Sequence, residues 1–295
     1  MSSNVLNVDQ IEQFIDRGFV KVEQAFPREV ALRAQDFLWE KLGDRGVIKS
    51  SPSTWTHAMV SIQETYSGPV FNACMTHKLE GCIEDLIGEG RWRDKGTEIG
   101  WGWWPVNFSV GAGRPWTVPS GGWHWDGIQF KHTVTAPDQG LLLLPHFSSV
   151  KTHGGGTVVA AGSHQIVARF LAAQREPIEL NTAIGKCSGD HPWLNALTHE
   201  ANSPLDRNAA FMDVITVDDH GTRLQVVEVT AEPGDVILCH PFLYHAAAQN
   251  LLGTPRFMCN RTTPLKAPME LSRVDGNYSP VEESIRRALH TETCA

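Results

Sequence analysis

The sequence lacks the features that mark several large classes of protein. It has six cysteines but no CxxC pair, so it predicts neither a zinc cluster nor a disulfide framework, and we expect reduced thiols. No segment approaches the ~18 consecutive apolar residues of a membrane-spanning helix. The N-terminus lacks the charged and apolar regions of a signal peptide. These absences predict a soluble, cytoplasmic protein.

Clusters of basic residues are also missing. The chain carries 25 Lys and Arg against 33 Asp and Glu, which gives a formal net charge of -8. Nucleic acids and anionic membranes are bound by clustered Lys and Arg that displace counterions. The sequence therefore predicts no nucleic-acid partner and no membrane partner, and it leaves open whether the chain forms a homodimer.

The first part of the chain, residues 1–95, is predicted to be a mostly helical support. Ile11, Phe14 and Ile15 recur at helical spacing, and Gly18 follows as a residue that can end a helix. A brief strand is expected next, and then further helices; these elements cover 19–22, 28–42 and 70–87. Since neither an internal repeat nor a low-complexity segment is present, we expect residues 1–295 to form a single domain.

Residues 96–265 are predicted to form the core, which is rich in β-strands. Short runs of Val, Thr, Trp and Phe alternate there with Gly and Pro, a texture typical of antiparallel sandwiches and barrels. A double-sheet jelly roll has about eight strands. The fold class predicted is mainly β with flanking helices around a double-stranded β-helix, the cupin-like jelly roll. The candidate strands are 103–110, 123–130, 140–145, 156–161, 211–217, 224–230, 235–240 and 257–263.

Two segments lie outside this pattern. The segment 165–210 is predicted to be an insertion, with a helix over 166–174 and a remainder rich in loops. Loops of this length commonly cover a site, so we expect a lid; packing against a neighbouring subunit is the alternative. In the C-terminal segment 266–295, the sequence from Ser279 to Glu282 has the form of a capping box with proline, which predicts a short helix.

The stretch GGWHWDGIQF at 121–130 places His124 and Asp126 two positions apart. In a strand these two side chains share one face, while Trp123 and Trp125 point away from it. An imidazole and a carboxylate are two of the three ligands of the facial triad that binds non-haem Fe(II). On this tripeptide alone, a hydrogen-bonded His–Asp pair without a metal is the commoner arrangement.

A second stretch, GDVILCHPFLYHAAAQNLLGTPR at 234–256, offers a third ligand and a cation. His240 and His245 are both candidates for the ligand, and Arg256 follows His245 by eleven residues. A guanidinium pairs with a carboxylate in a bidentate fork, so Arg256 suits a dicarboxylate co-substrate. The alternatives are core histidines and a surface ion pair.

With these motifs in this order, the sequence resembles the phytanoyl-CoA dioxygenase family of Fe(II)/2-oxoglutarate-dependent oxygenases. HWD at 124–126 matches the family's HxD, GGGTVVAAGSH at 154–164 its glycine-rich strand, and GDVILCHPFLYH at 234–245 its distal-histidine strand. The resemblance implies that His124, Asp126 and His245 bind the metal. It further implies that Arg256 binds the distal carboxylate of 2-oxoglutarate, with Arg261 as the alternative anchor, and that His240 is structural.

The resemblance also implies an activity and its cofactors. An enzyme of this kind uses Fe(II), 2-oxoglutarate and O₂ to hydroxylate an unactivated C–H bond of a small organic molecule, with release of succinate and CO₂. Desaturation, cyclisation and epimerisation are alternatives on the same centre. An inactive jelly-roll binding module is the alternative outside enzymes.

Two departures from the family pattern, and a few further residues, bear on the expected cavity. Ala247 stands where some members have a hydroxyl residue that assists the arginine, which leaves a second contact to the carboxylate unassigned, and Ala161 stands where relatives often have proline. We expect Trp123 and Trp125 to be buried under the N-terminal helices. The further candidates for the cavity wall are Trp103, Trp104, Gln129 and Thr157.

Overall fold

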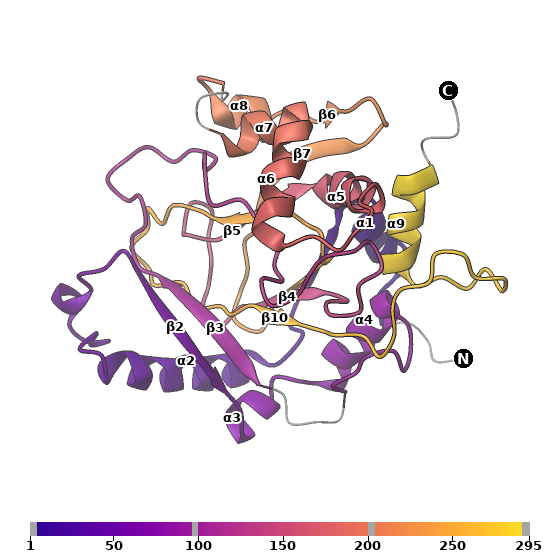
Figure 1. Ribbon diagram of the computed structural model, residues 1–295. Helices are drawn as coiled ribbons and strands as arrows, with labels where there is room; N and C mark the ends of the chain where they lie inside the picture. Colours follow the sequence, from indigo (N-terminus) through magenta and orange to yellow (C-terminus); the bar gives the residue numbers. More distant parts are fainter. Residues whose placement is uncertain (1–4, 96–99, 200–203, 291–295) are drawn as a thin grey trace.

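The computed structural model describes residues 5–95, 100–199 and 204–290, and its centre is a pair of four-stranded antiparallel sheets (Figure 1). The strand order is β1-β8-β4-β10 in the first sheet and β6-β7-β5-β9 in the second. With helices on the outside, this architecture confirms the predicted mainly β fold with a jelly-roll core. The strands are β1 (Phe19–Val22), β4 (Leu142–Pro145), β8 (Val236–Cys239) and β10 (Arg261–Thr262), then β5 (Thr157–Ala161), β6 (Thr216–Val217), β7 (Arg223–Glu228) and β9 (His245–Ala247).

The space between the two sheets is filled by apolar side chains from both. Along β4, Leu142 and Leu144 face the second sheet, whereas Leu143 packs with the side chains of the helices. Strands covered on both faces read as continuous apolar runs, as LLLL does here. Burying one such side chain stabilises the fold by roughly 1.5–3 kcal/mol. The cluster between the sheets consists of Phe19, Leu142, Leu144, Val159, Ala161, Val229, Ile237, Cys239, Leu243 and Met258.

A further antiparallel pair, β2 (Met59–Tyr66) and β3 (Trp101–Asn107), lies beyond β10. Single bridges join β3 to the segment that leads into β10, one between Gly102 and Asn260 and one between Asn107 and Arg256. The sequence did not predict β2, because only Ile62 is fully buried along it and its pattern does not alternate. This pair brings its own side chains next to the open end of the two sheets.

The N-terminal and C-terminal helices begin and end where capping chemistry predicts. The first helix ends at Gly18, whose φ of 81° is left-handed. The last begins with Ser279, whose backbone N–H and hydroxyl both donate to Glu282. The predicted helix over 70–87 is instead two helices, because Thr76 caps the second through its hydroxyl. These helices are α1 (Val8–Arg17), α2 (Arg28–Gly43), the 3₁₀ turn η1 (Pro52–Thr54), α3 (Pro69–Asn72), α4 (His77–Ile87) and α9 (Pro280–His290).

The segment 165–210 differs from its prediction. The expected helix over 166–174 is present as α5, but the described part of the remainder is mostly helical and not rich in loops, and its helices lie above β5 in Figure 1. Gly185 and Gly189 interrupt the helical pattern of the sequence, while Leu180, Ala183 and Cys187 are still buried on one side. The predicted strand 211–217 is reduced to the end of a helix and the short β6. The helices are α5 (Ser163–Ala172), α6 (Leu180–Asp190), α7 (Pro192–Thr198) and α8 (Arg207–Phe211).

The cysteines are inside the molecule. Within the described residues all five are buried, and they are free thiols, which agrees with the predicted reduced state; Cys294 lies outside those residues. No helix in the described part of the chain is long and apolar enough to cross a membrane.

Candidate metal centre

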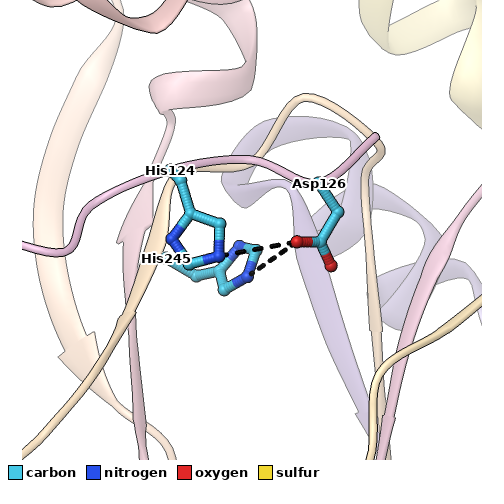
Figure 2. A group of neighbouring side chains, drawn as sticks. All are labelled: His124, Asp126 and His245. Atoms are coloured by element: carbon cyan, nitrogen blue, oxygen red, sulfur yellow. Dashed lines mark ion pairs between the residues drawn. The ribbon is translucent and has the colours of Figure 1, made fainter. Parts of the chain in front are cut away.

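The structure brings His124, Asp126 and His245 together at the open end of the two sheets (Figure 2). His124 and His245 form an isolated antiparallel bridge, in which each backbone N–H donates to the other residue's carbonyl at 3.0 and 2.8 Å. Directly opposed residues present their side chains on one face. The bridge therefore sets the two imidazoles side by side, with ring centroids 4.4 Å apart.

The position of Asp126 depends on a turn and not on a strand. The predicted strand 123–130 is wrong, because after the bridge at His124 the chain turns at Gly127, whose φ is 117°. A Cβ at Gly127 would lie 2.5 Å from the ring of Phe130 and 2.7 Å from that of His132, so glycine is required there. The expectation that His124 and Asp126 share one side nevertheless holds.

The carboxylate of Asp126 points at both histidines. Its Oδ1 lies 3.5 Å from Nε2 of His124 and 3.9 Å from Nε2 of His245, as the dashed lines of Figure 2 show. Its Oδ2 accepts a hydrogen bond of 3.0 Å from the side-chain amide of Asn260. Asn260 was not identified from the sequence, although it lies four residues after Arg256 on an extended segment and so shares its face.

Backbone carbonyls fix the protonation of both imidazoles. Nδ1 of His124 lies 2.8 Å from the carbonyl of Gly122, and Nδ1 of His245 lies 3.1 Å from that of Leu243. A ring nitrogen facing a carbonyl carries the proton, so each Nε2 keeps a lone pair directed at the centre. Metal-binding histidines are held in the same way by a partner on the second nitrogen.

These residues fit a divalent transition metal. One potential ligand atom from each of the three residues lies within 4.8 Å of the others, so small rotations would let one ion with bonds of ~2.1 Å reach all three. Nε2 of His245 is buried and has no hydrogen-bond partner among the described residues. A buried polar atom left unpaired is costly, and a metal would satisfy it. Two imidazoles and one carboxylate suit Fe(II).

The charges at the site depend on the carboxylate. Burial opposes ionisation of both Asp126 and His124, but the attraction between the two side chains outweighs it, so the pKa of Asp126 is lowered and that of His124 is raised. A metal ion bound at Nε2 of His124 takes the place of the proton that Asp126 would otherwise stabilise there. Burial lowers the pKa of His245 to about 4, which keeps this imidazole neutral. A carboxylate beside a neutral imidazole is the state in which both can donate electrons to a cation.

Arg256 lies behind this centre, between the sheets. On the extended segment that leads into β10, Asn260 contacts Asp126, and Met258 accepts a hydrogen bond of 3.5 Å from the hydroxyl of Thr157. Arg256 precedes Met258 by two residues, so its side chain points into the same space. It is 1% exposed, and its Nε and Nη1 are buried without a hydrogen-bond partner among the described residues.

The surroundings of Arg256 suit the binding of an anion. Burial lowers the pKa of Arg256 to about 10, so the guanidinium is still charged at neutral pH. An unpaired buried charge costs several kcal/mol. Arg261, the alternative anchor, is placed differently: its guanidinium donates to the carbonyl of Gly100 and lies over the rings of Trp92 and Trp101.

The other histidine of the motif, His240, is part of the core. It is fully buried and its ring lies against those of Phe14, His164 and Phe242. Burial lowers its pKa well below the usual value. The structure therefore separates His240 from the three converging residues.

A cavity of about 780 Å³ opens in front of His124 and Asp126. Both walls are contributed by parts of the chain remote in sequence, namely β2, β3, the turn after Asp126, α6 and β10. The lining is mixed in polarity and includes one arginine. Its residues are Gln63, Thr65, Asp94, Gly100, Gly102, Trp103, His124, Asp126, Gly127, Ile128, Gln129, Leu180, Asn181, Ile184, Asn260, Arg261, Thr262 and Pro264.

The tryptophans and other wall candidates have different positions. Trp103 and Gln129 line the cavity, whereas Trp104 is fully buried against Phe71. Trp125 is fully buried; its ring packs on Tyr244, and its indole N–H donates to His132 at 3.4 Å.

Thr157 does not line the open cavity. It is buried, and it lies opposite Ala247 in the register of β5 and β9. Strand β5 thus carries the hydroxyl of Thr157 directly opposite Ala247, the position at which some family members have a hydroxyl residue.

Comparisons with known proteins show similar folds. No protein-family model matches the sequence. No curated protein matches it. Among solved structures, the epimerase SnoN in complex with Fe³⁺, alpha ketoglutarate and nogalamycin RO is 14% identical, with a TM-score of 0.48 over 92% of this chain and 91% of that one. AviO1 from Streptomyces viridochromogenes Tue57 is 12% identical, with a TM-score of 0.46 over 91% and 99%.

A third similar structure is HygX from Streptomyces hygroscopicus with nickel and 2-oxoglutarate bound. It is 15% identical, with a TM-score of 0.45 over 86% of this chain and 85% of that one.

Proposed function

We propose that this chain is a non-haem Fe(II)- and 2-oxoglutarate-dependent oxygenase, related to the phytanoyl-CoA dioxygenase family, that hydroxylates an unactivated C–H bond of a small organic molecule. The metal ligands are His124, Asp126 and His245. Arg256 binds the distal carboxylate of 2-oxoglutarate. The observation that carries the proposal is the combination of three converging ligands with the buried guanidinium of Arg256, two of whose nitrogens have no hydrogen-bond partner among the described residues.

The residues have complementary tasks. His124 and His245 present neutral Nε2 atoms, and Asn260 holds Asp126 so that one carboxylate oxygen faces the metal. Arg256 orients the 2-oxo acid through its far end, and Thr157 is placed to supply the hydroxyl that residue 247 lacks. When bound, iron with 2-oxoglutarate and O₂ supplies the oxidising chemistry, which yields succinate and CO₂.

The cavity in front of the metal residues supports a small-molecule substrate. Its volume of about 780 Å³ lies within the range of sites for drug-sized ligands. Its opening between β3 and the helices of the insertion fits a substrate that enters beside the metal. A lid role for the insertion, residues 165–210, is part of this proposal, because Leu180, Asn181 and Ile184 of α6 line the cavity.

The proposal is tested by turnover without a known substrate. Purified protein supplied with Fe(II), O₂ and 2-oxoglutarate is expected to form succinate slowly, as oxygenases do when uncoupled. His245→Ala should lower this formation by about 100-fold, because it removes one of three metal ligands. Succinate is measured by chromatography, and Fe(II) binding is measured anaerobically on the same samples.

The matched control is His220→Ala, in the exposed turn between β6 and β7. It should leave succinate formation unchanged. If wild-type protein binds no Fe(II) and forms no succinate, the chain is a binding module on the same fold and the proposal is wrong.

A further inference from the structure

Trp103 has a backbone conformation that tryptophan rarely adopts. Its φ is 60°, in the left-handed region that favours glycine. The register shifts on both sides of this residue. Opposite Trp103, β2 advances from Ile62 to Thr65, three steps, while β3 covers Trp104 to Gly102, two steps. On the other side, β3 advances from Gly102 to Asn107, five steps, while the facing segment covers Arg256 to Asn260, four steps. Such a bulge redirects a side chain. Here it turns the indole of Trp103 toward the cavity.

Among the described residues, two others besides glycines have a positive φ, and local contacts secure both. Gln24 donates from its backbone N–H to Asp235 at 2.9 Å. His153 donates from its backbone N–H to Glu228 at 2.7 Å, and its ring stacks on Trp116 at 4.6 Å. Trp103 is less enclosed, since 49% of the residue's surface is exposed. The fold therefore keeps a strained tryptophan that contributes little to the core.

The surroundings of Trp103 are those of a binding surface. Ile128, in the turn after Asp126, is 64% exposed and lines the same cavity. The carbonyl of Trp103 accepts a hydrogen bond of 3.2 Å from the backbone of Asn260, the residue that holds Asp126. Exposed large apolar side chains in a concave site indicate a ligand that covers them. An exposed indole also offers a flat face to a ring.

We propose that Trp103 is a substrate-specificity residue, which stacks on a planar ring system of the substrate and so places the ring next to the metal residues. The substrate class that this implies is a planar, ring-containing organic molecule. The proposal rests on the proposed function only in calling this ligand a substrate, because stacking on Trp103 needs neither iron nor 2-oxoglutarate.

The test uses 2-naphthoate as a planar probe and hexanoate as an acyclic probe of the same charge. Both are titrated by calorimetry into the full-length protein without added iron or 2-oxoglutarate. Wild type is expected to bind 2-naphthoate at least about tenfold more tightly than hexanoate, since only the former stacks. Trp103→Gly and Trp103→Asn, both compatible with a positive φ, should each weaken 2-naphthoate about tenfold. Trp103→Phe should restore most of the binding.

The control is Leu252→Ala, an exposed apolar residue that does not line the cavity, and it should leave binding unchanged. Circular dichroism confirms that each variant is folded. Equal binding of the two probes by wild type, absence of 2-naphthoate binding, or undiminished binding by folded Trp103→Gly and Trp103→Asn would each overturn the proposal. A protein that stacks 2-naphthoate but forms no succinate contradicts the proposed oxygenase activity instead.

Discussion

The two ends of the site are built in different ways. The inner end consists of His245, Asp126 and Arg256, which lie at or between the two sheets. The outer end consists of Trp103, Ile128 and Arg261, which line the cavity in front of the metal residues. At the inner end, extended segments and one bridge fix His245 and Arg256 by register, and the turn at Gly127 sets the position of Asp126. At the outer end, a bulge and a turn decide which side chains face the cavity.

This difference assigns the reaction and the selection of the substrate to different parts of the site. Ladder pairing leaves little freedom in where a residue points, so the inner end can hold a metal and a small dicarboxylate in one geometry. Bulges and turns can change without disturbing the sheets, which makes the outer end the place where a substrate is selected.

The largest effect is expected at the innermost residue. Arg256→Met should weaken 2-oxoglutarate binding by about 100-fold, because a charged hydrogen-bond partner of the carboxylate is lost. Fe(II) binding should change by less than about threefold, since Arg256 is not a ligand. Anaerobic calorimetry with Fe(II)-loaded protein measures both. The counterpart is Arg261→Met at the outer end, which should leave 2-oxoglutarate affinity within about threefold of wild type. If Arg261→Met weakened 2-oxoglutarate binding more than Arg256→Met, Arg261 would be the anchor.

The next effect concerns the amide that holds the carboxylate ligand. Asn260→Ala should weaken Fe(II) binding by about tenfold, because Asp126 loses the hydrogen bond that orients it. Competition with a coloured chelator measures the affinity. Asn181→Ala, which removes an amide from the outer wall, should leave Fe(II) binding as in wild type. An equal loss in both variants would show that Asn260 has no orienting role.

A third effect concerns the insertion that borders the outer end. Asp218, in the turn between β6 and β7, accepts hydrogen bonds from Arg169 of α5 at 3.0 Å and from His191 at 3.4 Å. Burial opposes its ionisation, but these partners and Thr222 outweigh it and lower the pKa of Asp218 to about 2. The folded pKa lies below the unfolded value of about 3.9, so the stabilisation is complete above pH ~4 and is lost as the pH falls toward 2.

Asp218→Asn should therefore lower the free energy of unfolding by about 2 kcal/mol at pH 7 and flatten its pH dependence between about pH 4 and 2. Urea unfolding at several pH values measures both quantities. Asp219→Asn, in the adjacent exposed position, should change neither. An unchanged acid profile in Asp218→Asn would show that this carboxylate is not what fastens the insertion.

The smallest effect is at Trp103 and concerns stability alone. Glycine normally destabilises a strand relative to alanine, but at a positive φ the order reverses. Trp103→Gly should thus be more stable than Trp103→Ala by about 1 kcal/mol, measured by thermal unfolding. Should the alanine variant be the more stable one, the strain assigned to the bulge would not exist.

The motifs at the inner end could be predicted from the sequence because local chemistry fixes them. His124 and Asp126 are two residues apart, and Arg256 follows His245 at a set distance, so neither pair depends on distant packing. Asn260 was missed, although its spacing from Arg256 could have identified it. The helices of the insertion were missed because glycines interrupt their apolar pattern.

The sequence by itself determined the β-rich core, the candidate ligands and the candidate anchor, because runs of apolar residues and short spacings act locally. Only the tertiary structure decided that His245 pairs with His124, since that bridge joins segments more than a hundred residues apart. It also decided that the segment 123–130 turns at Gly127 and that Trp103, and not Trp104, faces the cavity. Those outcomes depend on packing and on a mismatch between two strands, which no single segment of sequence contains.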